Sequence, residues 1–255
     1  MNALLAALDA APAPVHFFLR DDDGGWDDAR LFALLDCTER AGVPIDLAMI
    51  PQSTSEALAA SLAARIDAAP QLLGVHQHGF AHTNHETVER KCEFGGSRRH
   101  DMQRQDLVAG RARLREWFAT RLDPIFTPPW NRCSAHTPTL LAELGYAALS
   151  RDCGAAAQRA LPELAVDLDW CKQRRLAAAA GENFVERIAR ALTRCIAQEQ
   201  STVGVMLHHA DMAEQELPFL AALLAAVKSH PRAQWRPMRE LFGHGDVSAL
   251  RRAAQ

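Results

Sequence analysis

Short apolar runs alternate with amphipathic helical segments along almost the whole chain, and this alternation limits the folds that it can adopt. About seven times, a run that favours a strand is followed by a segment with apolar residues at helical spacing. Apolar strands joined by helices are typical of a parallel sheet that is covered on both faces. No linker or change of composition divides the series, so we predict a single domain over residues 1–255.

The boundaries of these segments follow from turn residues and apolar spacing. Strands are expected at 15–19, 44–51, 71–79, 123–130, 146–150, 163–170 and 202–209. Helices are expected at 28–42, 54–69, 104–122, 137–145, 183–200 and 216–230, after a short leading helix.

Polar clusters follow the carboxyl ends of five different predicted strands, and they decide how the sheet is arranged. The clusters occupy 21–23, 76–85, 127–132, 167–169 and 208–209. A closed barrel brings all these strand ends into one ring around one site, whereas an open doubly wound sheet spreads them along a line. No G-x-G-x-x-G turn follows the first strand, which weakens the case for a dinucleotide-binding sheet. We therefore predict an α/β barrel, with fewer than eight strands allowed.

The segment GVHQHGFAHTNHE, residues 74–86, contains His76, His78, His82 and His85. Four imidazoles so close together bring little to a structural strand or helix, and they indicate metal binding or proton transfer. His78 and His82 are four residues apart and share a face on one helical turn. With a carboxylate from the aspartates at 21–23 they form a set that zinc and similar divalent ions use, with open positions for water.

Charge, hydropathy and cysteine spacing exclude several other classes of protein. A formal charge of −3 and a pI near 6.4 give no basic surface field, so nucleic acid is not expected as a partner. No apolar stretch is long enough to span a bilayer, and Asp9 interrupts an N-terminal segment that lacks a positive region. We therefore predict a cytoplasmic protein. The six cysteines form no CxxC pair and receive no ligand role.

The ordered series RDDDGG, HGFAH, TPPW, DLDW and LHH, from about Arg20 to His209, resembles the NodB-homology polysaccharide deacetylase superfamily. The resemblance implies a distorted (β/α)7 barrel in one domain, with one divalent metal ion. It also implies hydrolysis of an N-acyl or O-acyl group from a sugar. Zn²⁺ is the first candidate for the ion, with Ni²⁺, Co²⁺ and Mn²⁺ as alternatives.

The acidic and histidine motifs of the superfamily fall on specific residues of this chain. The resemblance makes Asp22 the general base and Asp23 a metal ligand, with His78 and His82 as the other two ligands. Because three aspartates are adjacent, the motif could also fall one residue earlier, with Asp21 as the base and Asp22 as the ligand. If Asp22 is the base and Asp23 the ligand, Asp21 is a nearby residue of the site.

The third motif, TPPW, places Trp130 beside the predicted reaction centre. Its backbone amide is the first donor after two prolines, and in the superfamily this amide helps to hold the oxyanion. The superfamily usually begins the motif with an arginine that braces the base, and here Thr127 stands there. Arg132 or Arg20 could take over that role.

The last motif supplies the general acid. The resemblance assigns this role to His208, with His209 as the alternative, because alternation along a strand lets only one of the two point inward. Asp167 or Asp169 would hold that imidazole through a hydrogen bond, as the superfamily's fourth motif does.

Further polar residues surround the predicted site. His76 and His85 are extra to the ligand set, and they would either orient the ligands or bind substrate. Pairing His76 with His78 is an alternative that fits the spacing less well. The following loop carries Glu93, Arg98 and Arg99, which either bind a charged substrate or face solvent.

These assignments predict a metal-dependent hydrolase that deacetylates a sugar. The expected substrate is an acetylated sugar, linked to a nucleotide or a lipid, that serves as an intracellular precursor of a surface polysaccharide. The alternatives are an amide hydrolase that acts on a non-sugar compound with the same barrel, and a catalytically inactive carbohydrate-binding relative. The sequence leaves the oligomeric state open.

Overall fold

The computed structural model describes residues 1–198 and 200–242, so the end of the predicted domain, 243–255, lies outside the described residues. The strands are β1 (Val15–Gly24), β2 (Ile45–Met49), β3 (Leu73–His78), β4 (Leu122–Thr127), β5 (Ala148–Asp152), β6 (Glu163–Asp169), β7 (Thr202–Leu207) and β8 (Ala233–Trp235). The α-helices are α1 (Asn2–Ala10), α2 (Asp28–Ala41), α3 (Glu56–Ala68), α4 (His100–Phe118), α5 (Thr137–Glu143), α6 (Trp170–Ala180), α7 (Phe184–Ala197) and α8 (Leu217–Lys228). Five 3₁₀ turns connect them: η1 (Ala119–Arg121), η2 (Pro129–Asn131), η3 (His209–Asp211), η4 (Glu214–Glu216) and η5 (Met238–Glu240).

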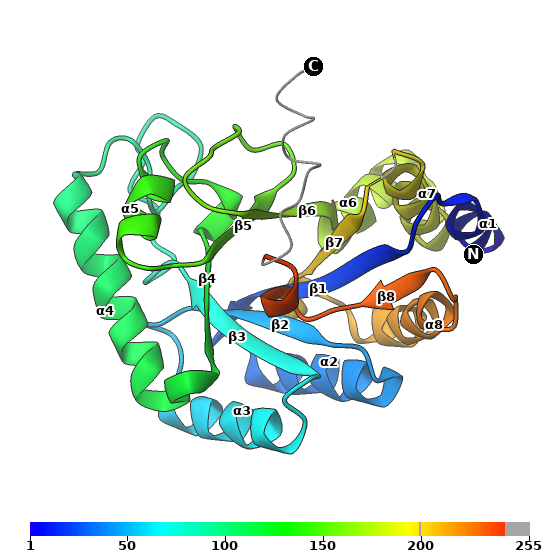
Figure 1. The fold of residues 1–255 in the computed structure, drawn as a ribbon, viewed down its shortest axis with the longest axis horizontal. Helices are drawn as coiled ribbons and strands as arrows, with labels where there is room; N and C mark the ends of the chain where they lie inside the picture. The colour runs from blue at the N-terminus through cyan, green and yellow to red at the C-terminus, as the bar shows by residue number, and fades with distance from the viewer. Residues whose placement is uncertain (199, 243–255) are drawn as a thin grey trace.

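Seven parallel strands close into a barrel (Figure 1), because β1 pairs with β7 on one side and with β2 on the other. The ring runs in chain order from β1 to β7. β4 and β5 meet over only two residue pairs, and register shifts interrupt the pairings β1–β2, β3–β4 and β6–β7. The predicted fold, a distorted (β/α)7 barrel, is confirmed.

Two described elements were not expected from the sequence. The three-residue strand β8 pairs with the first part of β1, from Val15 to Phe17, whereas β2 pairs with β1 only from Arg20 onward. β1 therefore has one neighbour at its start and another at its end on the same side. Helix α6 begins directly after β6, since the side chain of Asp169 ends the strand and caps the helix.

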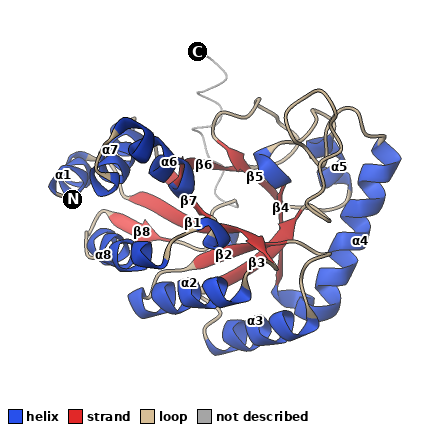
Figure 2. Cartoon of the chain, turned by 180° about the vertical axis from the view of Figure 1, so that it is seen from behind, coloured by secondary structure: helices blue, strands red, loops and turns tan. Residues whose placement is uncertain are grey.

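The helices surround the barrel (Figure 2), and their apolar faces pack on the outward-facing residues of the strands. β1, β2 and β3 have buried residues on both sides, as expected for a parallel sheet covered by helices. Helix α1 lies against α7 beside the start of β1. Among the described residues, no helix is both long enough and apolar enough to cross a membrane.

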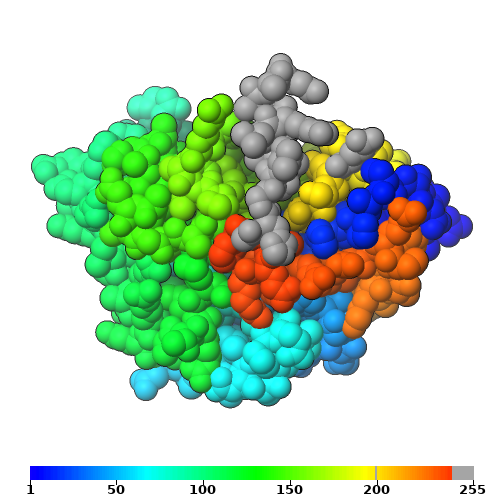
Figure 3. All heavy atoms as spheres, viewed as in Figure 1, coloured from blue at the N-terminus to red at the C-terminus, as the bar shows by residue number. Residues whose placement is uncertain are grey.

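The barrel interior has an apolar layer below a polar one. The lower layer consists of Phe18, Ile125, Ala148, Leu164, Val166, Met206 and Met238. Met238 belongs to η5, which closes the end of the barrel at which the strands begin; its segment covers the centre of the face seen in Figure 3. Above this layer, at the carboxyl ends of the strands, lie the charged and imidazole side chains of the candidate site.

Candidate active site

Strand β1 ends in an irregular turn that directs two consecutive aspartates to the same site. Strict alternation would place Asp21 and Asp23 on one face and Asp22 on the other. The pairing with β2 is interrupted between Asp21 and Gly24, and Asp23 has a left-handed backbone with φ 67°. A left-handed aspartate in an interrupted strand is typical of a bulge that redirects a side chain. Asp23 thus joins Asp22 beside the histidines of β3.

Asp23, His78 and His82 form a compact cluster that could hold a metal ion, with one ligand atom from each residue within 4.8 Å of the others. Oδ1 of Asp23 lies 3.3 Å from Nε2 of His78 and 3.1 Å from Nε2 of His82. The two imidazoles outweigh the effect of burial, so the pKa of Asp23 lies well below its usual value. The structure therefore brings together the three residues predicted as ligands.

The turn after β3 places His82 by means of a buried carboxylate. Glu93 is fully buried, and its two oxygens accept hydrogen bonds from the backbone amides of Phe80 (3.1 Å) and Ala81 (2.8 Å). His82 itself has a left-handed backbone, with φ 55°. From the sequence alone, Glu93 is expected either to bind a charged substrate or to face solvent. Its actual contacts show that it shapes the turn that carries His82.

Thr127 occupies the position where the superfamily usually has an arginine, and it supports two histidines. Its carbonyl oxygen lies 3.0 Å from Nδ1 of His78, which places the ring proton there and leaves Nε2 free to bind a metal. Its hydroxyl lies 2.9 Å from Nε2 of His76. Burial, and then the charge of Arg20, lower the pKa of His76 to about 3, so this ring is neutral. His76 therefore lies beneath the ligands, as a supporting residue.

Arg20 contacts Asp22, the carboxylate predicted as the base. Its guanidinium is fully buried and holds both carboxylate oxygens of Asp22, at 2.8 Å and 3.0 Å. It also donates across the barrel to Ser150 (2.7 Å) and to Asn131 (2.6 Å). Although burial alone would raise the pKa of Asp22, Arg20 and the nearby histidines lower it below its usual value. Asp22 is therefore an anion whose orientation is fixed.

The two adjacent histidines after β7 have different surroundings. Nδ1 of His209 lies 2.6 Å from Oδ2 of Asp21, and Nε2 lies 2.5 Å from the carbonyl oxygen of Trp26. Burial alone would lower the pKa of His209, but Asp21 and the Trp26 carbonyl raise it to about 9. His209 is thus a buried cation with both ring nitrogens engaged, and it anchors the loop after β1.

His208 is the histidine that faces the candidate site. It is partly exposed, and its charge contributes to the lowered pKa of Asp22. Within the described part of the chain, its buried Nδ1 has no hydrogen-bond partner. Asp21 pairs with His209, and the roles of Asp22 as base and of His208 as acid stay predictions.

Two tryptophans enclose His82. The ring of Trp130 lies 4.4 Å from the His82 imidazole, and the ring of Trp26 lies 4.8 Å from it in an edge-on arrangement. Trp130 has a left-handed backbone with φ 57°, which turns its side chain toward the cluster. Trp26 was not expected at the site, since it follows the aspartate motif at a position that no spacing rule singles out.

Four predicted residues make their described contacts outside the cluster. His85 is exposed, and its described hydrogen bonds involve only its backbone, so an orienting role toward the ligands has no support. Arg132 donates to the carbonyl oxygen of Lys91, not to the base. Asp169 accepts from the amide of Lys172 at the start of α6, and Asp167 accepts from the amide of Gly204, so neither is seen to hold a site imidazole.

Comparisons with known proteins agree with this architecture. No family model matches the sequence, and no curated protein matches it. A solved structure assigned as a polysaccharide deacetylase, from Mycobacterium smegmatis, is 15% identical with a TM-score of 0.69, covering 94% of this chain and 92% of that one. A family 4 acetyl xylan esterase from Clostridium thermocellum, in complex with a cobalt ion, is 15% identical with a TM-score of 0.53, covering 89% and 90%.

A third similar structure is a pseudoenzyme of the same carbohydrate esterase family, from Bacillus anthracis. It is 13% identical with a TM-score of 0.61, and the alignment covers 91% of this chain and 66% of that one. At such low identity these likenesses establish the architecture of the chain. The protein therefore has the barrel fold of the polysaccharide deacetylases and family 4 carbohydrate esterases, the superfamily that its motifs resemble.

Proposed function

We propose that this protein is a metal-dependent hydrolase that removes an acetyl group, or another acyl group, from a sugar. The observation that carries the proposal is the cluster of Asp23, His78 and His82 beside the fixed carboxylate of Asp22. Solved structures with the same fold include an acetyl xylan esterase that holds a cobalt ion.

The donor atoms of the cluster suit a divalent metal. Zinc bonds to nitrogen and oxygen of about 2.0–2.2 Å, at tetrahedral angles, separate neighbouring donors by about 3.3–3.6 Å. The distances from Asp23 Oδ1 to the two imidazole nitrogens, 3.1 Å and 3.3 Å, are close to that spacing. Zn²⁺ is the first candidate, and Ni²⁺, Co²⁺ and Mn²⁺ are the alternatives.

The residues around the cluster supply the proton transfers of a hydrolysis. A divalent ion held by Asp23, His78 and His82 would supply Lewis acidity for the acyl carbonyl and would lower the pKa of a bound water molecule to roughly 7. Asp22 accepts the proton of the attacking water, because Arg20 keeps its carboxylate ionised and oriented. His208 donates a proton to the nitrogen or oxygen that leaves when the acyl bond breaks. The Trp130 amide donates to the developing oxyanion.

A purified sample tests the metal and the reaction separately. We expect about one divalent ion per chain and release of acetate from N-acetylated or O-acetylated oligosaccharides. His78→Ala/His82→Ala should lose both. Asp22→Asn should keep the metal and lose turnover by about 10² to 10⁴, because the ligand set stays whole while the base is removed.

The matched control is His100→Ala/His136→Ala. It also removes two imidazoles, which stack on each other outside the cluster, so metal and turnover should stay unchanged. A full metal content in His78→Ala/His82→Ala would contradict the ligand assignment. Neither bound metal nor acetate release from any acylated sugar would favour the carbohydrate-binding alternative, and release only from non-sugar amides would favour the amide hydrolase.

Two predictions rest on the sequence alone. The substrate is predicted to be a nucleotide- or lipid-linked precursor of a surface polysaccharide, and the protein is predicted to be cytoplasmic. An acetate-release screen that compares such precursors with intact polymers tests the first of these.

A further inference from the structure

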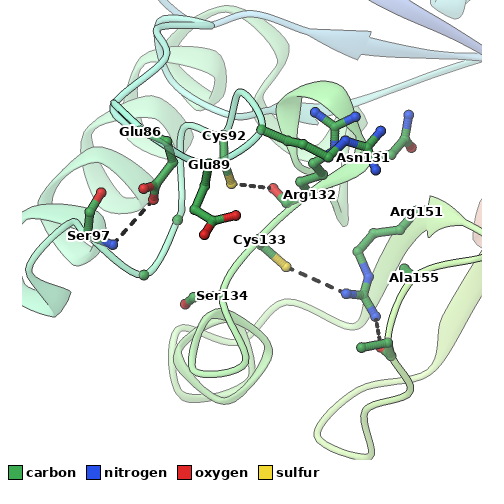
Figure 4. Close-up of a pocket in the computed structure, with 14 residues that line it drawn as sticks. Glu86, Glu89, Cys92, Ser97, Asn131, Arg132, Cys133, Ser134, Arg151 and Ala155 are labelled. Atoms are coloured by element: carbon green, nitrogen blue, oxygen red, sulfur yellow. Dashed lines mark hydrogen bonds between the residues drawn. The ribbon is translucent and has the colours of Figure 1, made fainter.

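A cavity of about 590 Å³ lies next to the candidate site, within the size range of small-ligand pockets. Its wall is formed by the loop between β3 and α4, by the residues after β4 and by the residues after β5 (Figure 4). Asn131 in this wall directly follows Trp130, whose ring contacts His82, and Cys92 directly precedes Glu93, which holds the His82 turn. The cavity and the metal cluster therefore share two of their supporting segments.

Two arginines of this wall lack a carboxylate partner. Among the described residues, no carboxylate oxygen lies within 4.0 Å of the guanidinium nitrogens of Arg90 or Arg132. Arg132 donates to one backbone carbonyl, which leaves further N–H groups available. Both arginines line the same cavity; burial lowers the pKa of Arg132 and the charge of Arg90 lowers it further, while Cys92 and Asp152 act in the opposite direction.

The other arginines of the region are already paired, which makes these two distinct. Arg151 in the same wall holds both oxygens of Glu163, at 2.8 Å and 3.0 Å. Arg98, which the sequence analysis considered for a charged substrate, pairs with Asp106 at 2.6 Å. Arg99 pairs with Asp101 at 2.7 Å.

We propose that Arg90 and Arg132 form a subsite for an anionic group of the substrate, a carboxylate or a phosphate carried on or next to the acylated sugar. The inference rests on the proposed function, because it places this group in the cavity while the acyl group is at the cluster of Asp23, His78 and His82. Two neighbouring guanidiniums without a counter-ion repel each other, and a bound oxyanion relieves that repulsion while accepting paired hydrogen bonds.

Two glutamates also line the cavity, and they make the proposal more specific. Glu86 accepts a hydrogen bond from the amide of Ser97, so its carboxylate is engaged in the loop. Glu89 is exposed and, as Figure 4 shows, belongs to the same wall as Arg132. Its charge would oppose a bound anion. Removing that charge should therefore strengthen anion binding, whereas removing either arginine should weaken it.

Binding of three sugars that carry the same acetyl group tests the proposal. The probes are N-acetylglucosamine, N-acetylglucosamine 6-phosphate and N-acetylglucosaminuronic acid, titrated by calorimetry into the metal-loaded protein. At least one anionic sugar should bind about tenfold or more tightly than the neutral one. Arg90→Gln and Arg132→Gln should each remove most of that preference, and Glu89→Gln should increase it. The anionic sugar whose affinity exceeds that of N-acetylglucosamine by the larger factor identifies the group as phosphate or carboxylate.

The control is Arg99→Gln, which removes another arginine of the same loop. The side chain of Arg99 is exposed, pairs with Asp101 and lies outside the cavity wall. It should leave the preference unchanged. Equal affinity for the three sugars, or a preference that survives both arginine variants, would overturn the proposal. The same titrations with His78→Ala/His82→Ala separate the two proposals: an arginine-dependent preference that persists without metal supports the subsite even if the deacetylase assay fails.

Discussion

Both ends of the barrel bury aspartates, but the pKa values of these carboxyls are shifted in opposite directions at the two ends. At the end where the strands finish, Asp22 is held by Arg20 and Asp23 by two imidazoles, and both pKa values lie below the usual range. At the end where the strands begin, burial dominates and raises the pKa of Asp46 to about 7 and that of Asp123 to about 6.

The partners explain this difference. Asp46 accepts one hydrogen bond, from the amide of Met238 in the segment that closes the barrel, and its other oxygen is buried without a hydrogen bond among the described residues. Asp123 lies 3.6 Å from Arg239, which does not offset its burial. Charge compensation, more than depth, thus decides whether a buried carboxylate is an anion that can bind a metal or accept a proton.

The largest expected effect comes from breaking the compensation at the site. Arg20→Met should lower the free energy of unfolding by about 3 to 5 kcal/mol, because it leaves the carboxylate of Asp22 buried without its cation. Arg20→Met/Asp22→Asn should recover most of the loss. Urea unfolding of the two single variants and the double variant measures the coupling. If Arg20→Met lowers the free energy of unfolding by less than about 1 kcal/mol, charge compensation does not distinguish the aspartates at the two ends.

The next largest expected effect is a pH-dependent change in stability caused by Asp46, at the end where the strands begin. The folded-state pKa of Asp46, about 7, is above its unfolded value of 3.8, so its stabilising effect is complete below pH 3.8 and is lost as the pH rises through 7. The loss should amount to about 2 to 4 kcal/mol. Thermal or urea unfolding between pH 4 and 8 measures this dependence. Asp46→Asn should flatten it, and an unchanged slope would refute the assignment.

The buried cation near the site titrates in a higher range. The pKa of His209 rises from 6.5 to about 9, so its contribution to stability is complete below pH 6.5 and is lost as the pH rises through 9. We expect a loss of about 1 to 3 kcal/mol over this interval. Unfolding of the wild type and of Asp21→Asn at pH 6.5 and 9 should show a smaller pH effect in the variant, since Asp21 is the main partner of His209.

The smallest effect concerns the tryptophan at the edge of the site. Trp26 is 39% exposed, so Trp26→Ala should lower the free energy of unfolding by no more than about 1 kcal/mol. It should weaken metal binding by less than about tenfold, because His82 would lose one of the two rings that restrain it. Competition titration with a chelator measures the affinity. Trp235→Ala, which removes a ring packed on Phe17, provides the comparison away from the site and should leave the metal affinity unchanged.

The sequence predicted what depends on periodicity and on short spacings. Alternating strands and helices predicted the barrel, and the resemblance predicted Asp23, His78 and His82 as ligands, which the structure brings together. β8 has only three residues and no periodic pattern, so its pairing with β1 could not be predicted.

Contacts between distant side chains were also beyond the sequence. Arg20 reaches Ser150 across the barrel, and Glu93 reaches back to the His82 turn, but no local pattern marks either contact. Asp169 was expected to hold a site histidine because of the resemblance to the superfamily's fourth motif, whereas here it accepts from an amide at the start of α6. Long-range partners of buried polar groups follow from the closed barrel, and only the three-dimensional structure shows them.

The position of β1 in the ring has a consequence for how the protein is made. β2 can pair with β1 early, but β7, whose Gly204 pairs with Phe18 on the other side of β1, is made only after most of the chain has left the ribosome. Until then β1 has an open edge on that side, and such late, non-local pairing slows folding and favours association between incomplete chains. Asp22 lies in β1 and His208 directly follows β7, so nascent chains that end before β7 cannot carry the assembled site.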